Sequence, residues 1–125
     1  MRTLIIIPVL LFSLLLGVPS YSADFNKGLT AAQSGDFATA LKEWKPLAEQ
    51  GHAQAHYNLG LMYKNGWGVP LDKVHAYIWF NIAAANGDKD AEEKRNNLSK
   101  TLSQSQVQEA QRLARECVKK NYKGC

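Results

Sequence analysis

The sequence repeats itself at a fixed spacing, and this repeat limits the possible folds more than any other feature. Asp36 and Gly51 recur 36 residues later as Asp72 and Gly87. A period of about 20–50 residues is typical of stacked supersecondary units that bury their apolar faces against one another. The chain is therefore expected to form a stack of similar units. Four further pairs keep the same spacing: Ala40 and Ala76, Trp44 and Phe80, Ala48 and Ala84, Ala55 and Ala91.

The apolar residues within each unit recur at helical rather than alternating spacing. Asp36 is a favourable N-cap and Gly51 a helix stop, and Asp72 and Gly87 repeat that arrangement. The stripe between the first cap and stop consists of Phe37, Ala40, Leu41, Trp44, Leu47 and Ala48. Further helices are expected over 24–34, from about residue 53, over 88–102 and from about residue 104. Because no stretch alternates over strand length, we predict an all-α domain.

Two helices carry more specific expectations about packing. Gly60 lies in the middle of the helix that begins near Ala53, where glycine costs about 1 kcal/mol relative to alanine. We therefore expect another helix backbone to pass close to it. The last helix is expected to bury one face, made of Val107, Ala110, Ala114, Cys117 and Val118.

The first residues follow the plan of a secretory signal peptide. A short basic start precedes an apolar run from Leu4 to Val18, and small residues follow up to Ala23. The run is shorter than the roughly 20 residues that span a bilayer. Residues 1–22 are interpreted as a signal peptide cleaved after Ser22, or alternatively after Ala23; an uncleaved anchor is the other interpretation. Cleavage would leave no stable membrane insertion, and the protein is expected to be exported, either periplasmic or secreted.

Both cysteines lie near the end of the sequence, at Cys117 and Cys125. An even number of cysteines in an exported chain indicates a disulfide. Their spacing matches neither the Cys-x-x-Cys redox motif nor a four-ligand zinc site. A structural disulfide is therefore predicted to hold the end of the chain against the last helix.

The strongest resemblance to a known family lies in the middle of the chain. The segment 51–63 reads GHAQAHYNLGLMY, and 66–70 reads GWGVP. Together with Asp72, Trp79-Phe80, Ala83-Ala84 and Gly87, these residues resemble the Sel-one-like repeats, a subclass of tetratricopeptide-like helical hairpins. The resemblance implies a short α-solenoid, with a partial repeat over 24–50 and the best repeat over 51–87.

The sequence departs from the family pattern after Ala91. Lys94, Arg95, Asn96 and Asn97 are too polar for the central helix of another repeat. Solenoids need terminal caps with a polar outer face. Residues 88–125 are therefore expected to form a disulfide-closed C-terminal cap, and residues 23–125 to form a single repeat domain.

Several kinds of chemistry find little support in the sequence. The net charge of +4 comes without a clustered basic face, so no nucleic acid is expected as a partner. His52 and His56 share a helix face, but two ligands without a third give no metal site, and no cofactor is expected. In the family pattern these two positions are variable and exposed, and His75 is expected to be a solvated histidine.

The acidic and hydroxyl side chains also show no catalytic pattern. No carboxylates are placed by sequence into an apolar pocket that would split their pKa values. The motifs Ser-x-x-Lys, Ser-Asp-Asn and Lys-Thr-Gly of serine β-lactam enzymes are absent from the sequence. The protein is therefore expected not to be an enzyme. The carboxylates expected on polar helix faces are Glu43, Glu49, Glu92, Glu93, Glu109 and Glu116.

The resemblance implies an exported interaction module that binds a protein or peptide on the concave face of its repeats. Trp67, in the loop between two glycines, either anchors a partner or folds back over the repeat. Two alternatives remain, namely a hydrolase of β-lactam or cell-wall substrates, as in some cysteine-rich relatives, and an envelope stress or assembly accessory. Dimerisation to extend the short stack is also open. The candidate contact residues are Tyr57, Asn58, Met62, Lys64, Trp67 and Tyr77.

Overall fold

The computed structural model describes residues 22–125. The predicted signal peptide therefore lies outside the described residues, apart from Ser22. Throughout residues 22–125 the secondary structure is helical, as the sequence predicts. The helices are α1 (Phe25–Gln33), α2 (Phe37–Glu49), α3 (Ala53–Asn65), α4 (Lys73–Ala85), α5 (Lys89–Ser99) and α6 (Gln104–Lys119).

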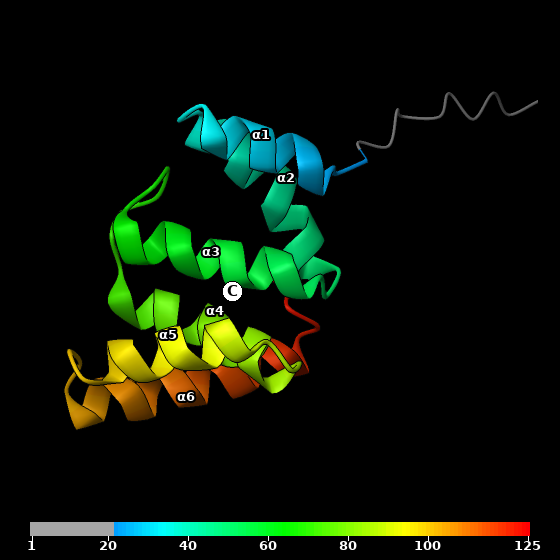
Figure 1. Ribbon diagram of the computed structural model, residues 1–125. Helices are drawn as coiled ribbons and strands as arrows, with labels where there is room; N and C mark the ends of the chain where they lie inside the picture. The colour runs from blue at the N-terminus through cyan, green and yellow to red at the C-terminus, as the bar shows by residue number, and fades with distance from the viewer. Residues whose placement is uncertain (1–21) are drawn as a thin grey trace, which may run out of the picture.

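The helices form a short stack of hairpins (Figure 1). α1 packs on α2, α2 on α3, and α3 on α4. α4 also packs against α5 and α6, which places it at the centre of the lower half of the stack. α1 and α3 lie one above the other on the same side of the molecule, and α1 makes its main contacts with α2. No helix within residues 22–125 is long and apolar enough to cross a membrane.

Polar side chains fix where each helix begins. Asp36 and Asp72 accept hydrogen bonds from the backbone N–H groups of Thr39 and His75, which confirms both predicted caps. α3 is capped by an imidazole instead, because Nδ1 of His52 accepts from the N–H of Ala55 at 3.2 Å. The other N-caps are Asp24, Asp88 and Ser103, the last within a capping box.

Gly60 is explained by a close contact, though not by the one expected. A Cβ atom at this position would lie 2.6 Å from the ring carbons of Phe80. The expectation of a neighbouring helix backbone was therefore wrong, because an aromatic ring from α4 fills the space. Trp44, the repeat equivalent of Phe80, packs in the same way against Gly28 on α1. In both hairpins a glycine on the first helix receives an aromatic ring from the second.

The last helix and the turn after it cover the open end of the stack. α6 buries Ala110, Ala114 and Cys117. Val118 is exposed, contrary to expectation, because it lies about 100° around the helix from Cys117. The predicted disulfide between Cys117 and Cys125 is present, with the two Cα atoms 5.7 Å apart.

Candidate binding groove

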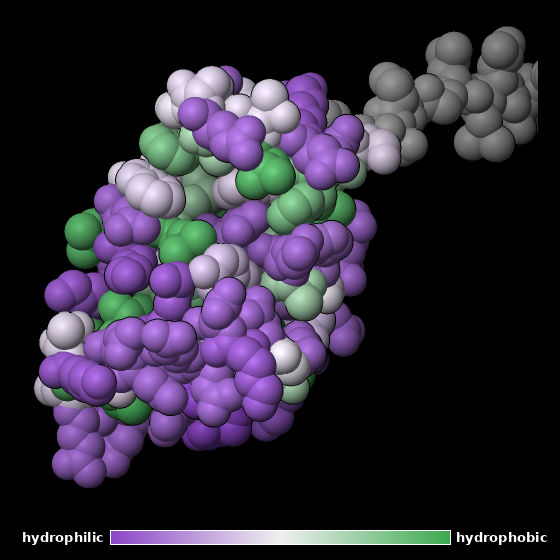
Figure 2. Space-filling view, in the orientation of Figure 1, coloured by the Kyte–Doolittle hydropathy of each residue, from purple (hydrophilic) through white to green (hydrophobic). Residues whose placement is uncertain are grey.

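An apolar pocket opens between α1, α2, α3 and the loop after α3, with a volume of about 360 Å³. None of its nine lining residues carries a charge. Figure 2 shows green and white areas over α1 and between α1 and α3, whereas the surface over α5 and α6 is mostly purple. The lining residues are Leu29, Ala32, Gln33, Phe37, Trp44, Asn58, Leu61, Met62 and Trp67.

Trp67 lines this apolar pocket from the loop after α3. Gly66 ends α3 in the left-handed conformation, with φ of 69°, and the N–H of Trp67 then donates to the carbonyl of Met62 at 2.9 Å. The indole stacks on Phe37 with 5.2 Å between ring centroids and 8° between planes. Trp67 nevertheless stays 41% exposed. Trp67 therefore folds back against α2 and keeps a solvent-exposed face, and its role as a partner anchor stays a prediction.

A second pocket, of about 310 Å³, lies beside the first and shares Leu29 and Asn58 with it. Asp88 and Asp90, at the start of α5, form part of its lining together with Tyr57. We call this the acidic pocket, and we call the two pockets together the α1–α3 groove. The groove thus has an apolar part under Trp67 and a negatively charged part beside α5.

The negative charge of the acidic pocket affects the pKa of the Tyr57 hydroxyl. Partial burial is the main reason why the pKa of Tyr57 lies above its usual value near 10. The carboxylates of Asp90, Asp88 and Glu93 raise the pKa further, because a negative field opposes formation of the phenolate. The tyrosine therefore remains a neutral hydrogen-bond donor at physiological pH.

The middle of this groove belongs to a known repeat. Residues 53–88 match the family model of the Sel1 repeat. The chain carries a Sel1 repeat. It consists of α3, the loop that holds Trp67, α4 and the cap of α5, and the match supports a helical protein–protein interaction module. The Gly60–Phe80 contact lies entirely inside this Sel1 repeat.

One similar protein is a chitin synthase regulator, SKT5, of Malassezia restricta. It is 42% identical over 55 residues, which is 44% of the present chain and 4% of that protein. The chain therefore spans only a small part of the length of this curated relative.

Of the candidate contact residues named from the sequence, some line the α1–α3 groove and others do not. Asn58, Met62 and Trp67 line the apolar pocket, and Tyr57 joins Asn58 in the acidic pocket. Lys64 lines neither pocket. Tyr77 is buried in α4, where its hydroxyl accepts a hydrogen bond from Gln111 at 3.3 Å.

Sequence reasoning did not find the groove residues outside the Sel1 repeat. Leu29 on α1 and Phe37 on α2 line the apolar pocket together with Leu61. Leu29 is 39% exposed, and its place in the lining becomes visible only once α1 is placed against its neighbours. Helical periodicity alone gave no signal that separated this surface from the core.

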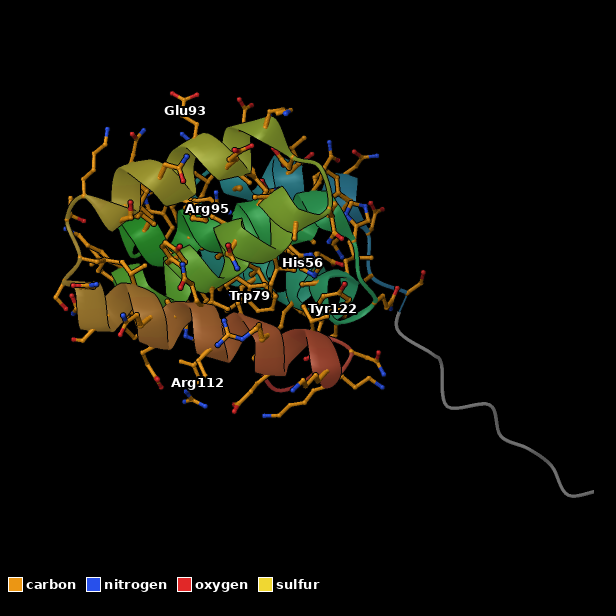
Figure 3. All side chains as sticks on the ribbon, turned by 90° about the horizontal axis from the view of Figure 1, so that it is seen from below. His56, Trp79, Glu93, Arg95, Arg112 and Tyr122 are labelled. Carbon is orange, nitrogen blue, oxygen red and sulfur yellow. A yellow bond between two sulfur atoms is a disulfide. The ribbon has the colours of Figure 1, made fainter. Side chains whose placement is uncertain are left out.

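His56 is a core residue, so the expectation that it is exposed was wrong. Its side chain is fully buried between the rings of Trp79 and Tyr122 (Figure 3), with centroid distances of 5.4 and 4.7 Å. Nε2 donates to the carbonyl of Ala48 at 2.7 Å, which fixes the neutral tautomer with its proton on Nε2. Trp79 from α4 and Tyr122 from the C-terminal turn together cover the ring.

Burial lowers the pKa of His56 below its usual value near 6.5, and the hydrogen bond to Ala48 only partly opposes this. The nearby His52 lowers the pKa further. Because the unfolded chain then binds a proton more readily than the folded one, stability is complete above pH 6.5 and falls as the pH decreases. Urea unfolding between pH 7.5 and 5 should show this loss, and His56→Phe should weaken it. An unchanged pH profile in the variant would contradict the assignment.

Two further polar residues differ from expectation. His75 is only partly exposed, because its ring stacks on Tyr63 and its Nε2 lies 2.6 Å from the main-chain oxygen of Cys125. Glu43 does not lie on a polar face: only 1% of it is exposed, and it accepts from the N–H of Asp24 at 3.0 Å. Lys27 approaches the same carboxylate at 3.4 Å. These contacts serve the fold, and no group of three potential metal ligands occurs within residues 22–125.

Proposed function

We propose that this protein is an exported, non-catalytic binding module that holds a segment of another protein in the α1–α3 groove. The observation that carries the proposal is the uncharged apolar pocket under the half-exposed Trp67. Concave and mostly apolar sites of this size bind ligands by burial and a few polar contacts. Asn58 and Gln33 are the polar side chains of the lining, and neither is a nucleophile or a general acid.

Export is part of this proposal. The apolar run after the basic start of the chain is typical of a signal peptide. The bond between Cys117 and Cys125 supports the same compartment, since disulfides persist in oxidising environments and are rare in reducing ones. A regulator among the similar proteins is consistent with a role exerted through contact with a partner.

The test uses the protein in the form that its cells process and export. Its partners are captured by cross-linking and identified by mass spectrometry. Leu61→Asp places a charge in the apolar pocket, and Trp67→Ala removes the aromatic face. Both should reduce capture of the main partner at least about tenfold, as is typical of buried interface anchors. The matched control is Leu71→Asp, at a 60% exposed leucine outside both pockets, which should leave capture unchanged.

Either of two results would contradict the proposal. The first is equal capture by the wild type and by a folded Leu61→Asp variant. The second is an uncleaved N-terminus, which the same mass spectra of the purified chain would reveal and which bears on export. Cleavage after Ser22 or Ala23 is expected, and a chain that retains Met1 would contradict export by a cleaved signal.

A further inference from the structure

We infer that the partner segment is a basic one, with a bulky apolar side chain next to a lysine or arginine. This inference rests on the proposed binding function and specifies the chemistry of the partner. The apolar side chain would enter the apolar pocket under Trp67. The basic side chain would reach the acidic pocket beside α5.

The two pockets lie close enough for a single segment to fill both. They share Leu29 and Asn58, so the surface between them is continuous. Leu29 is exposed between the pockets and can contact the aliphatic part of a lysine or arginine side chain. Asn58 offers an amide donor and acceptor at the same point, which suits the main chain of a bound peptide.

The carboxylates at the acidic end are available to a partner. Asp88 and Asp90, which line the acidic pocket, form no ion pair with any residue of the described part of the chain. One oxygen of Asp88 accepts the N–H of Ala91 at 3.0 Å, and the other has no such partner within residues 22–125. Glu93 lies outside the pocket lining and likewise forms no ion pair with a described residue. Figure 3 shows Glu93 projecting from α5 into solvent. Lys89 and Lys94 lie on the same helix, but neither lines the pocket.

Three other acidic side chains of the described residues already have a basic partner. Glu109 and Glu116 are both bound by Arg112 at 2.6 Å, on the far side of α6 from the groove. The buried Glu43 is approached by Lys27. Since the apolar pocket contributes no charge, the charged side chains that line the groove are Asp88 and Asp90, and these favour a cation at that end.

The test measures binding of three fluorescent octapeptides by anisotropy. The first carries a tryptophan and a leucine followed by two lysines, the second has glutamates in place of the lysines, and the third has serines in place of the apolar pair. The lysine peptide should bind at least about tenfold more tightly than the glutamate peptide, and the serine peptide should not bind measurably. The advantage of lysine should shrink between low and high salt, because exposed charges are screened.

A pair of variants locates the charge effect. Asp90→Lys should weaken binding of the lysine peptide about three- to tenfold and strengthen binding of the glutamate peptide. Glu92→Lys makes the same charge change at an exposed residue of α5 that lines neither pocket, and it should change the lysine peptide's affinity less than about twofold.

Three outcomes would overturn the inference. Equal binding of the lysine and glutamate peptides would do so while leaving the binding function of the groove intact. Equal effects of Asp90→Lys and Glu92→Lys would place the charge effect elsewhere. A dimer in sedimentation that Leu61→Asp dissociates would show that a second copy of the chain occupies the groove. If the wild-type protein captured no partner and bound none of the three peptides, the proposed function itself would be rejected.

Discussion

Phe80→Ala is expected to lower the free energy of unfolding by about 3–5 kcal/mol, the range for removing a buried aromatic ring. The side chain is fully buried and joins α3 to α4 inside the Sel1 repeat. It packs against Gly60 and lies 5.7 Å from the ring of Tyr57. Because Gly60 has no side chain with which to fill the space, the cavity should collapse only partly. Urea unfolding followed by circular dichroism measures the loss.

The contact between Phe80 and Gly60 can be tested by a double-mutant cycle. Gly60→Ala alone should destabilise by about 1–3 kcal/mol, despite the higher helix propensity of alanine, because its Cβ would overlap the ring. In the Phe80→Ala background the same change should cost much less or even stabilise. If Phe80→Ala leaves too little folded protein, Phe80→Leu replaces it in the cycle. Additive effects would contradict a direct contact.

Loss of the disulfide is the second large effect. Replacing Cys117 and Cys125 together by alanine should reduce the free energy of unfolding by about 2–3 kcal/mol, as expected for a short closed loop. The bond holds a turn in which Asn121 and Tyr122 both have positive φ, an unfavourable conformation for a bulky residue. It also keeps Tyr122 on His56 and Cys125 beside His75.

Two measurements distinguish this role from a general loss of packing. Trypsin should cleave after Lys119, Lys120 and Lys123 faster in the double-alanine variant, because the turn is released before the helices unfold. The reduced wild type should show the same stability as the variant. Equal stability of the oxidised and reduced wild type would contradict a stabilising role for the bond.

Much of the fold could be predicted because its determinants are local. Asp36 and Asp72 recur at the repeat spacing, and each caps a helix as expected. The aromatic pair Trp44 and Phe80 marks the same position in two hairpins. Periodicity, caps and glycine stops act within a few residues, so one sequence contains enough information to place the helices.

The polar core residues could not be predicted in the same way. Glu43 is buried because α1 packs on α2, and the N–H of Asp24 donates to the carboxylate of Glu43. His56 is buried because Tyr122, more than sixty residues away, covers it. Both outcomes depend on long-range packing of segments that differ from the repeat pattern. Spacing along one helix shows which residues share a face but not what covers that face.

The residues of the groove could be predicted only in part from the sequence. Trp67 could be selected from the sequence because two glycines place it on a tight loop. Leu29 and Phe37 could not, since they come from helices that precede the Sel1 repeat and become part of the surface only through the stacking of α1 and α2. The acidic end was also missed, because Asp88 and Asp90 belong to the polar helix expected over 88–102, and only the packing of the helices brings them beside Tyr57.

Hydrogen exchange of the protein with and without its captured partner tests the central claim most directly. Binding in the α1–α3 groove predicts slower exchange in α1, in α3 and in the loop that carries Trp67. Exchange on the outer face of α6 should remain unchanged. Protection confined to α5 and α6, with α1 and the loop unaffected, would contradict the groove as the binding surface.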